Sequence, residues 1–512
     1  MRLSRAIRIL AFLLIGVFIT LVSCSRNETS PSAAAPEKAA IQANWDKVVM
    51  VSKTNTTLQV VVNPPLRRGS KIHDTTYQSL KEMGVDYVRY VPWLPYPKLG
   101  VAELEPPKDG KTSWDFSLID PMTEDFINAT AGHSVIINFS TIPQWMYKTD
   151  KPVAYPADPD QPVWDYEQGT ELRDPTFKEV ADYYARLLGW YTQGGFTDEY
   201  GKRHESGHHY KIDYWEVLNE IDFEHTIAPE TYTHLYDAVV AAMHKVDPRV
   251  KFVGLALGIP TTSPQYFEYF LNPKNHKPGI PLDMISYHFY ACASPDADPQ
   301  STIHSFWDQA DGFINVVRYI QTTRQRLSPQ TRTTVDEIGS QDPNDFNEGK
   351  PGYVFKDFPQ SYWSLSAANY AYVFAELAKL GIDVAGDSQW VGYPTQFPSV
   401  SMVDWNTGKP NTRAWVLKLL HDNFAPGDKI IDTTSTLPYV YAQGFVTSDG
   451  KHKLLLINKR DRSFEVSIPG VDGAQVTYID LTTGFQPPAV AQLSGDHATL
   501  GGLGVAVVTL SK

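Results

Sequence analysis

The sequence has few cysteines and no cluster of residues suited to holding a metal. Its 512 residues include 2 cysteines, Cys24 and Cys292. Because Cys24 lies in a segment predicted below to carry lipid, we expect no internal disulfide and a fold that depends on its hydrophobic core. Cys292 is interpreted as a small buried residue near a strand end. The histidines His204, His208 and His209 lack acidic partners at ligand spacing, so they are expected to be solvated, and no metal or other cofactor is predicted.

Positive charge is also scarce. The chain has 45 Lys and Arg residues against 58 Asp and Glu residues, for a formal net charge of −13. Without Arg2, Arg5 and Arg8 near the N-terminus, 42 basic residues remain and the net charge is −16. Such an acidic protein is a poor partner for nucleic acid or for an anionic membrane surface. Neutral or cationic substrates remain open.

The one long apolar run lies at the N-terminus. Ile9 to Val22 follows a short basic segment and overlaps Leu21-Val-Ser-Cys24. This pattern is typical of a secretory signal and is too short for an ordinary membrane span. The final quartet resembles the lipobox of bacterial lipoproteins, whose cysteine is lipidated. We therefore predict a signal peptide at 1–23, lipid on Cys24 and a location in the bacterial cell envelope, with membrane contact only through that lipid. An uncleaved anchor is the alternative.

Composition then divides the rest of the chain. Residues 24–44 are rich in Ser, Ala and Pro and predict a flexible tether. Across 45–423, short apolar runs alternate with helical periodicity, which predicts a catalytic (β/α)8 barrel. Beyond 423 come short strands without helices, which predict an appended antiparallel β-sandwich at 424–512. A strand at 46–53 is expected either to precede the barrel or to pair with this sandwich.

The barrel elements can be placed individually. A long loop rich in proline and aromatic residues, Pro143 to Asp174, is expected on the catalytic rim. Helices are predicted at Thr75–Met83, Phe177–Tyr191, Glu230–Val246, Ile303–Leu327 and Ser364–Leu380. The eight barrel strands are predicted at Leu58–Asn63, Tyr87–Val91, Ser134–Phe139, Tyr214–Leu218, Phe252–Leu257, Met284–His288, Thr333–Asp336 and Val384–Trp390.

Two glutamates follow predicted barrel strands. Asn219 and Glu220 end the fourth strand, and Glu337 closes the seventh. In a (β/α)8 barrel, the C-terminal ends of all strands open onto one face, where active sites lie. The alternative interpretation of Asn219-Glu220 is a structural one, in which the acid stabilises the N-terminus of a following helix. Two carboxyl groups in different protonation states are what glycoside hydrolysis requires, and a separation of about 5–5.5 Å would give retention by double displacement.

These segments resemble known carbohydrate-active enzymes. Trp215-Glu-Val-Leu-Asn-Glu220 and Thr333-Thr-Val-Asp-Glu-Ile-Gly-Ser340 are similar to the strand-four and strand-seven motifs of clan A glycoside hydrolases. Trp114-Asp-Phe-Ser-Leu-Ile-Asp120, Asp283-Met-Ile-Ser-Tyr-His-Phe-Tyr290 and the order of barrel then sandwich resemble glycoside hydrolase family 39, the group of β-xylosidases and α-L-iduronidases. Leu218 replaces a Trp and Ile221 a Pro that many relatives carry, which weakens any inference about the substrate.

The resemblance implies a role for each matching residue. Glu220 is the expected acid/base, Glu337 the nucleophile and Asn219 the donor to the sugar 2-hydroxyl. Arg89 is expected to keep the nucleophile ionised, or alternatively to form a structural ion pair. Further substrate-binding residues are expected at the ends of strands six and eight and beside strand three: His288, Tyr290, Trp390, Asn138 and Trp145, with a place in the core as the alternative for Trp390.

The expected function is therefore a retaining O-glycoside hydrolase acting on a poly- or oligosaccharide. A catalytically silent carbohydrate-binding lipoprotein on the same barrel is the alternative. A barrel enzyme of unrelated chemistry is a third possibility, since fold alone does not fix function, but it would leave the two glutamates unexplained. The sequence assigns neither the sugar nor the oligomeric state.

Overall fold

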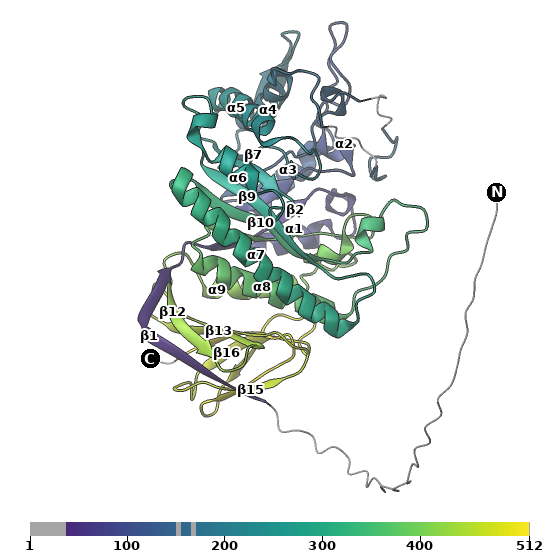
Figure 1. Cartoon of the computed structure of the whole chain (residues 1–512). Helices are drawn as coiled ribbons and strands as arrows, with labels where there is room; N and C mark the ends of the chain where they lie inside the picture. Colours follow the sequence, from purple (N-terminus) through teal and green to yellow (C-terminus); the bar gives the residue numbers. More distant parts are fainter. Residues whose placement is uncertain (1–36, 150–154, 165–169, 511–512) are drawn as a thin grey trace, which may run out of the picture. The chain divides into compact units, whose positions relative to one another are not determined.

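The computed structural model describes residues 37–149, 155–164 and 170–510. Eight parallel strands close into a barrel in the order β10-β11-β2-β3-β4-β7-β8-β9, which confirms the predicted fold (Figure 1). They are β2 (Asn55–Val61), β3 (Val88–Val91), β4 (Val135–Ile137), β7 (Tyr214–Glu216), β8 (Lys251–Leu257), β9 (Met284–Cys292), β10 (Arg332–Gln341) and β11 (Val384–Asp387).

The strand ends differ from the predicted ones where tertiary pairing decides them. β9 and β10 continue past their predicted ends because they pair with each other as far as Cys292 and Gln341. β11 stops at Asp387, before the predicted end at Trp390. These shifts matter because they decide which side chains face the mouth of the barrel.

Helices surround the barrel strands (Figure 1). α5 begins with Pro229, whose fixed φ suits a first helical turn. At the start of α7, the Asp298 side chain accepts hydrogen bonds from the backbone N–H groups of Gln300 and Ser301. The helices are α1 (His73–Met83), α2 (Pro97–Gly100), α3 (Ile119–Ala129), α4 (Lys178–Thr192), α5 (Pro229–Val246), α6 (Pro264–Phe270), α7 (Pro299–Leu327), α8 (Gln360–Lys379) and α9 (Thr412–Asn423).

The predicted helices correspond to α1, α4, α5, α7 and α8, whereas α2, α3, α6 and α9 were not predicted. Loop segments between them contain short elements that the sequence pattern also left out. These are η1 (Pro64–Leu66), η2 (Gln144–Met146), η3 (Pro273–Asn275), η4 (Asp345–Asn347), η5 (Pro398–Val400) and the hairpin β5 (Gly195–Thr197) and β6 (Arg203–Glu205).

The C-terminal part forms a largely antiparallel nine-stranded sheet in the order β17-β16-β19-β14-β13-β12-β1-β15-β18. β1 pairs antiparallel with β12 and parallel with β15, so it links the two layers of the sandwich. The strands are β1 (Lys38–Val51), β12 (Lys429–Ser435), β13 (Val440–Val446), β14 (His452–Asn458), β15 (Phe464–Ser467), β16 (Gln475–Ile479), β17 (Ala489–Gln492), β18 (His497–Leu500) and β19 (Val505–Thr509).

β1 corrects the predicted extent of the tether. The strand begins at Lys38, whereas the tether was expected to reach residue 44. Ala39 and Ile41 are buried in the sandwich core, where they pack in one cluster with Leu454 and Val466. Small residues dominate this start of the strand, so its alternating pattern was too weak to recognise.

The barrel and the sandwich are in direct contact. Phe424, just after α9, packs on Phe445 of β13 with ring centroids 4.3 Å apart. The Lys459 ammonium lies 3.4 Å from the ring centroid of Tyr372 on α8, and burial lowers the pKa of this lysine to about 8. The sandwich therefore braces the helices α8 and α9 that follow β10 and β11.

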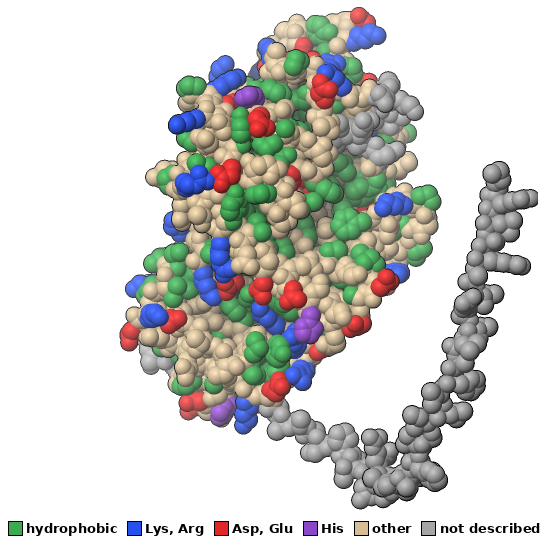
Figure 2. Space-filling model, in the orientation of Figure 1, with side chains coloured by type: hydrophobic (Ala, Val, Ile, Leu, Met, Phe, Trp, Pro, Cys, Tyr) green, Lys and Arg blue, Asp and Glu red, His purple; other side chains and the backbone are tan. Residues whose placement is uncertain are grey.

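Membrane contact was predicted only through the lipid on Cys24. Within the described ranges, no helix has the combination of length and apolar character that a bilayer crossing requires. The predicted signal peptide and Cys24 lie outside the described residues. Acidic and basic side chains are dispersed over the face drawn in Figure 2, and the described residues form no broad positive patch there.

Candidate active site

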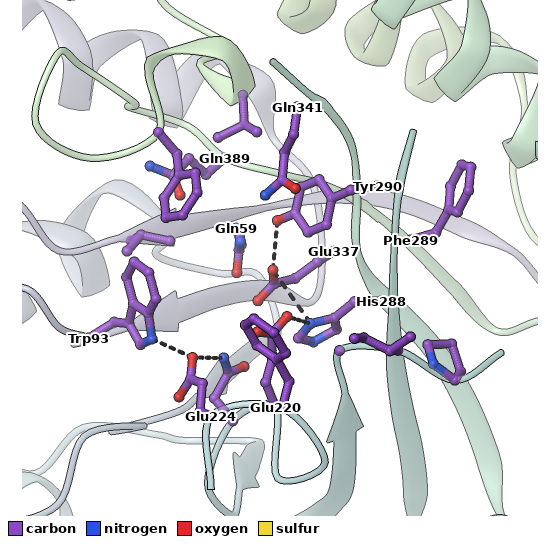
Figure 3. A pocket seen from close by; sticks show the side chains of 18 of the residues that line it. Gln59, Trp93, Glu220, Glu224, His288, Phe289, Tyr290, Glu337, Gln341 and Gln389 are labelled. Atoms are coloured by element: carbon purple, nitrogen blue, oxygen red, sulfur yellow. Dashed lines mark hydrogen bonds and ion pairs between the residues drawn. The ribbon is translucent and has the colours of Figure 1, made fainter. Parts of the chain in front are cut away.

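A cavity of about 710 Å³ opens at the C-terminal ends of the barrel strands. Glu220 follows β7, His288 and Tyr290 lie on β9, and Glu337 lies on β10; all four line this cavity, together with Asn219 (Figure 3). The two glutamates named from the sequence, 117 residues apart, thus meet at one site. This is the face on which barrel enzymes carry their catalytic groups.

Glu337 is surrounded by hydrogen-bond donors. Tyr290 donates its hydroxyl hydrogen to Glu337 Oε2 over 2.6 Å, and the Arg89 guanidinium contacts Oε1. His288 Nδ1 lies 3.5 Å from Oε2. Burial alone would raise the pKa of Glu337, but the positive charges of His288 and Arg89 and the Tyr290 hydrogen bond outweigh it, so the pKa is lowered. Glu337 is therefore held as a carboxylate.

Glu220 has the opposite character. His288 Nδ1 lies 2.9 Å from Glu220 Oε1, whereas Arg89 and Tyr290 direct their hydrogen bonds to Glu337. Burial and the nearby negative charge of Glu337 raise the pKa of Glu220 despite His288. Glu220 therefore tends to keep its proton when Glu337 has lost its own.

The backbone that presents Glu220 is strained. Leu218 and Glu220 have φ values of 62° and 42°, in the left-handed region that residues other than glycine rarely adopt. The Glu220 N–H donates to the carbonyl of Ala256 over 2.8 Å, which holds this turn against β8. An ideal Cβ on Gly258 would lie 2.8 Å from the Glu220 carboxyl carbon. Glycine at 258 is thus required for the observed position of the acid.

Arg89 is a fully buried cation that joins several polar groups. Its Nε donates to Glu216 over 2.6 Å, and its Nη1 donates to Gln59 over 2.7 Å. Its Nη2 donates to Asn219 Oδ1 over 2.6 Å. Together with the contact to Glu337, these bonds hold the Glu337 carboxylate and the Asn219 amide in place on one guanidinium.

Three groups at the site could in principle ligate a cation. Each of Glu220, His288 and Glu337 offers one ligand atom, and these atoms lie within 4.8 Å of one another. Burial alone would lower the pKa of His288, but Glu337 and Glu220 raise it to about 9. A protonated imidazole cannot bind a metal. The trio therefore fits a proton-sharing cluster better than a metal site.

A model of the glycosyl hydrolases family 39 matches residues 33–333. The chain belongs to glycosyl hydrolase family 39. It is accordingly a glycoside hydrolase, and its substrate is a carbohydrate. A search of curated protein sequences finds no match.

Solved structures of other glycoside hydrolases share the fold of this family 39 protein. The GH51 arabinofuranosidase from Xanthomonas axonopodis pv. citri has a TM-score of 0.62 at 12% identity, covering 93% of this chain and 100% of its own. The GH51 α-L-arabinofuranosidase from Thermotoga petrophila RKU-1 has 0.59 at 14%, covering 92% and 100%. The GH30 endoxylanase from Clostridium papyrosolvens C71 has 0.55 at 14%, covering 93% and 100%. At these identities the likeness concerns the fold alone.

Three residues expected to bind the sugar lie elsewhere in the family 39 structure. Trp390 is fully buried in the core, where its indole N–H donates to the carbonyl of Thr76 over 3.3 Å. Asn138 is buried behind the site and donates to Glu216 over 2.7 Å. Trp145 donates to the backbone carbonyl of Glu103 over 2.9 Å. None of the three lines the described cavity.

The structure also defines the surroundings of the histidines and the cysteine that were expected to play no part in binding or catalysis. His204 is half-buried and lies 2.8 Å from Asp198, and His208 is half-buried and lies 3.3 Å from Asp120, so the expectation of solvated side chains was wrong for these two. His209 is exposed, as expected. Asp198 lies six residues before His204, across the β5–β6 hairpin, whereas Asp120 lies on α3, 88 residues before His208. Cys292 is half-buried, and burial raises the pKa of its thiol to about 11.

Several cavity residues were not predicted. Gln389 faces the cavity at the position where Trp390 was expected to act (Figure 3). Trp164, from the long loop expected on the rim, also lines it. A third carboxyl, Glu224, lies beside Trp93 and Asn219. Its one sequence signal is its position four residues after Glu220.

Proposed function

We propose that this family 39 enzyme hydrolyses O-glycosidic bonds with retention of anomeric configuration, with Glu337 as nucleophile and Glu220 as acid/base. The observation that carries the proposal is the asymmetry between two neighbouring carboxyl groups. Arg89 and Tyr290 contact Glu337 and favour its charged form, whereas burial favours the protonated form of Glu220. A nucleophile must be ionised and a general acid must carry a proton.

The separation of the two groups supports retention. One carboxylate oxygen of Glu220 lies within 4.8 Å of one of Glu337. Retaining enzymes hold their carboxyl groups about 5–5.5 Å apart, whereas inverting enzymes leave about 6.5–9.5 Å for a water molecule. This close approach of two carboxyl oxygens supports the narrow arrangement of a retaining enzyme over the wider one of an inverting enzyme.

The proposed reaction proceeds in two steps. Glu337 attacks the anomeric carbon while Glu220 gives its proton to the leaving oxygen, so the glycosidic C–O bond breaks as an ester bond to Glu337 forms. Glu220, now ionised, then removes a proton from water. The water oxygen bonds to the anomeric carbon, and Glu337 departs as a carboxylate. Asn219 is proposed to bind the sugar 2-hydroxyl throughout.

The lining of the cavity favours a neutral sugar. No lysine or arginine is among its described lining residues, and the buried Arg89 is already bonded to Glu216, Glu337 and Asn219. An acidic sugar would therefore meet the charge of Glu337 without a free counter-ion. The arabinofuranosidases and the endoxylanase of similar fold make arabinofuranosides and xylosides the first substrates to test.

A panel of aryl glycosides, followed by NMR of the first sugar released, tests this proposal. We expect hydrolysis of at least one neutral glycoside with retained configuration, and no turnover by Glu337→Ala. An inverted first product would overturn the double displacement. A catalytically silent binding role is not favoured, because it does not explain why one carboxyl group is held ionised and its neighbour protonated. Full inactivity of the wild type across the panel would support that role instead.

We also propose that the enzyme is held in a bacterial envelope by lipid on Cys24, on the basis of Leu21-Val-Ser-Cys24. Intact-mass measurement of the mature native protein should show a lipidated N-terminal cysteine, and Cys24→Ala should release the protein from the membrane fraction. A free N-terminus at another residue would indicate ordinary secretion instead.

A further inference from the structure

Glu224 is a third carboxyl group in the active-site cavity, beside the two proposed catalytic ones (Figure 3). It lies in the segment after β7, four residues beyond Glu220. Its side chain is 7% exposed. The two-step reaction proposed above gives it no part, so its burial at this position calls for another explanation.

Two donors converge on one oxygen of Glu224. The Trp93 indole N–H donates to Oε1 over 2.7 Å, and Asn219 Nδ2 donates to the same oxygen over 3.0 Å. Neither an indole nitrogen nor an amide nitrogen accepts a hydrogen bond, so Oε1 is the acceptor in both bonds. The Glu224 side chain is thereby fixed relative to the Asn219 amide.

Asn219 is held from its other end as well. Arg89 Nη2 donates to Asn219 Oδ1 over 2.6 Å. Because a guanidinium cannot accept a hydrogen bond, the amide oxygen must face Arg89 and the amide nitrogen must face Glu224. The nitrogen has two hydrogens, and the bond to Glu224 uses one of them. The other can be presented to a substrate in one fixed direction.

We propose that Glu224 is a positioning residue that orients the Asn219 amide toward the sugar 2-hydroxyl. This proposal rests on the proposed function, since it assigns the amide to the 2-hydroxyl of a bound glycoside. Hydrogen bonds to that hydroxyl strengthen in the transition state of glycoside hydrolysis, so a misdirected amide slows the chemical step. Trp93 supports the same orientation by fixing Glu224.

The charge of Glu224 fits this role. Burial and the neighbouring Glu220 raise the pKa of Glu224 to about 8, so at neutral pH it is largely a neutral acid. A neutral carboxyl accepts the two hydrogen bonds without adding a second negative charge beside Glu337. Glutamine has the same shape and also offers an acceptor oxygen, so Glu224→Gln should preserve the arrangement, whereas Glu224→Ala should not.

The test compares two matched aryl glycosides, one with a 2-hydroxyl and its 2-deoxy counterpart. We expect Glu224→Ala to lower kcat/KM about tenfold on the first substrate, mainly through kcat, and to change it little on the second. Asn219→Ala should lose at least as much, and the double variant should be no worse than Asn219→Ala alone. Glu224→Gln should recover most of the loss. Glu268→Ala, which removes a carboxylate bonded to Arg326 on α7, is the control.

Equal losses by Glu224→Ala on the two substrates, or additive losses in the double variant, would overturn the proposal. Such results would mean that Glu224 acts on the site as a whole or merely stabilises the fold, and thermal unfolding of the variants would separate these cases. If Glu220→Ala and Glu337→Ala stay fully active, the proposed function fails instead, whatever the Glu224 ratios are.

Discussion

Replacing Tyr290 with phenylalanine should shift the pH dependence of the reaction without moving the ring. The Tyr290 hydroxyl donates to Glu337 Oε2 over 2.6 Å, and its loss removes a bond made to the ionised carboxylate. A hydrogen bond to a charged group contributes about 1.5–3 kcal/mol. Since about 1.4 kcal/mol corresponds to one pKa unit, the loss is worth about one to two units.

The direction of the shift follows from which form the bond stabilises. The pKa of Glu337 is lowered by its partners, so removing a donor raises it. The nucleophile is then ionised only at higher pH, and the acidic limb of kcat/KM, which reports groups of the free enzyme, should move up by about one to two pH units. Initial rates across the acid range with an activated aryl glycoside measure it.

The control is Tyr370→Phe, which removes a buried hydroxyl that donates to the carbonyl of Ala385 over 2.9 Å, away from the carboxyl groups. Its acidic limb should stay where it is in the wild type. An unmoved limb in Tyr290→Phe, with activity reduced equally at every pH, would refute the reasoning. Tyr290 would then act on the substrate and not on the ionisation of Glu337.

Two further predictions concern close packing and buried charge. Gly258→Ala places a Cβ about 2.8 Å from the Glu220 carboxyl carbon and should lower kcat on poor leaving groups at least tenfold. Gly312→Ala on α7 lines the same cavity, but its added Cβ meets nothing within 4 Å beyond its own helix and should leave kcat unchanged; equal activities of the two variants would contradict the account. Arg413→Ala leaves the buried Asp387 without its partner and should lower the free energy of unfolding, measured by urea titration, by about 3–5 kcal/mol. The exposed Arg249→Ala should leave the urea midpoint almost unchanged, and a wild-type urea midpoint for Arg413→Ala would show that the buried pair contributes nothing.

The parts of the fold set by local pattern could be predicted from the sequence. Alternating apolar runs located all eight barrel strands, and the strand-end positions of Glu220 and Glu337 brought them to one mouth. Arg89 could be placed because it lies on β3, and His288 and Tyr290 because they lie on β9. The position of each of these residues is set by the strand on which it lies.

Residues beyond a strand end could not be placed in this way. β11 stops at Asp387, and the chain then turns, so Gln389 faces the cavity and Trp390 enters the core. Asn138 is one step behind the site because it bonds to Glu216 and the carbonyl of Leu218. Such details depend on side-chain packing between separate strands, which periodicity does not record.

Loops were still harder to predict. Glu224 reaches the cavity because the segment after β7 folds back, with the N–H of Glu224 donating to the carbonyl of Glu220 over 2.7 Å. His204 and Asp198 meet through the β5–β6 hairpin, whose short strands gave no clear signal. In both cases the path of a local turn, which composition and periodicity do not specify, decides which groups become neighbours.

The most direct test of the assignment of Glu220 and Glu337 is azide rescue of Glu220→Ala. With an activated aryl glycoside, whose leaving group needs no proton, this variant should still form the glycosyl-enzyme. Azide needs no general base, so adding it should raise the turnover rate and yield a glycosyl azide of retained configuration, identified by NMR. A Glu220→Ala enzyme that is equally inactive on good and poor leaving groups and gives no azide product would contradict the account.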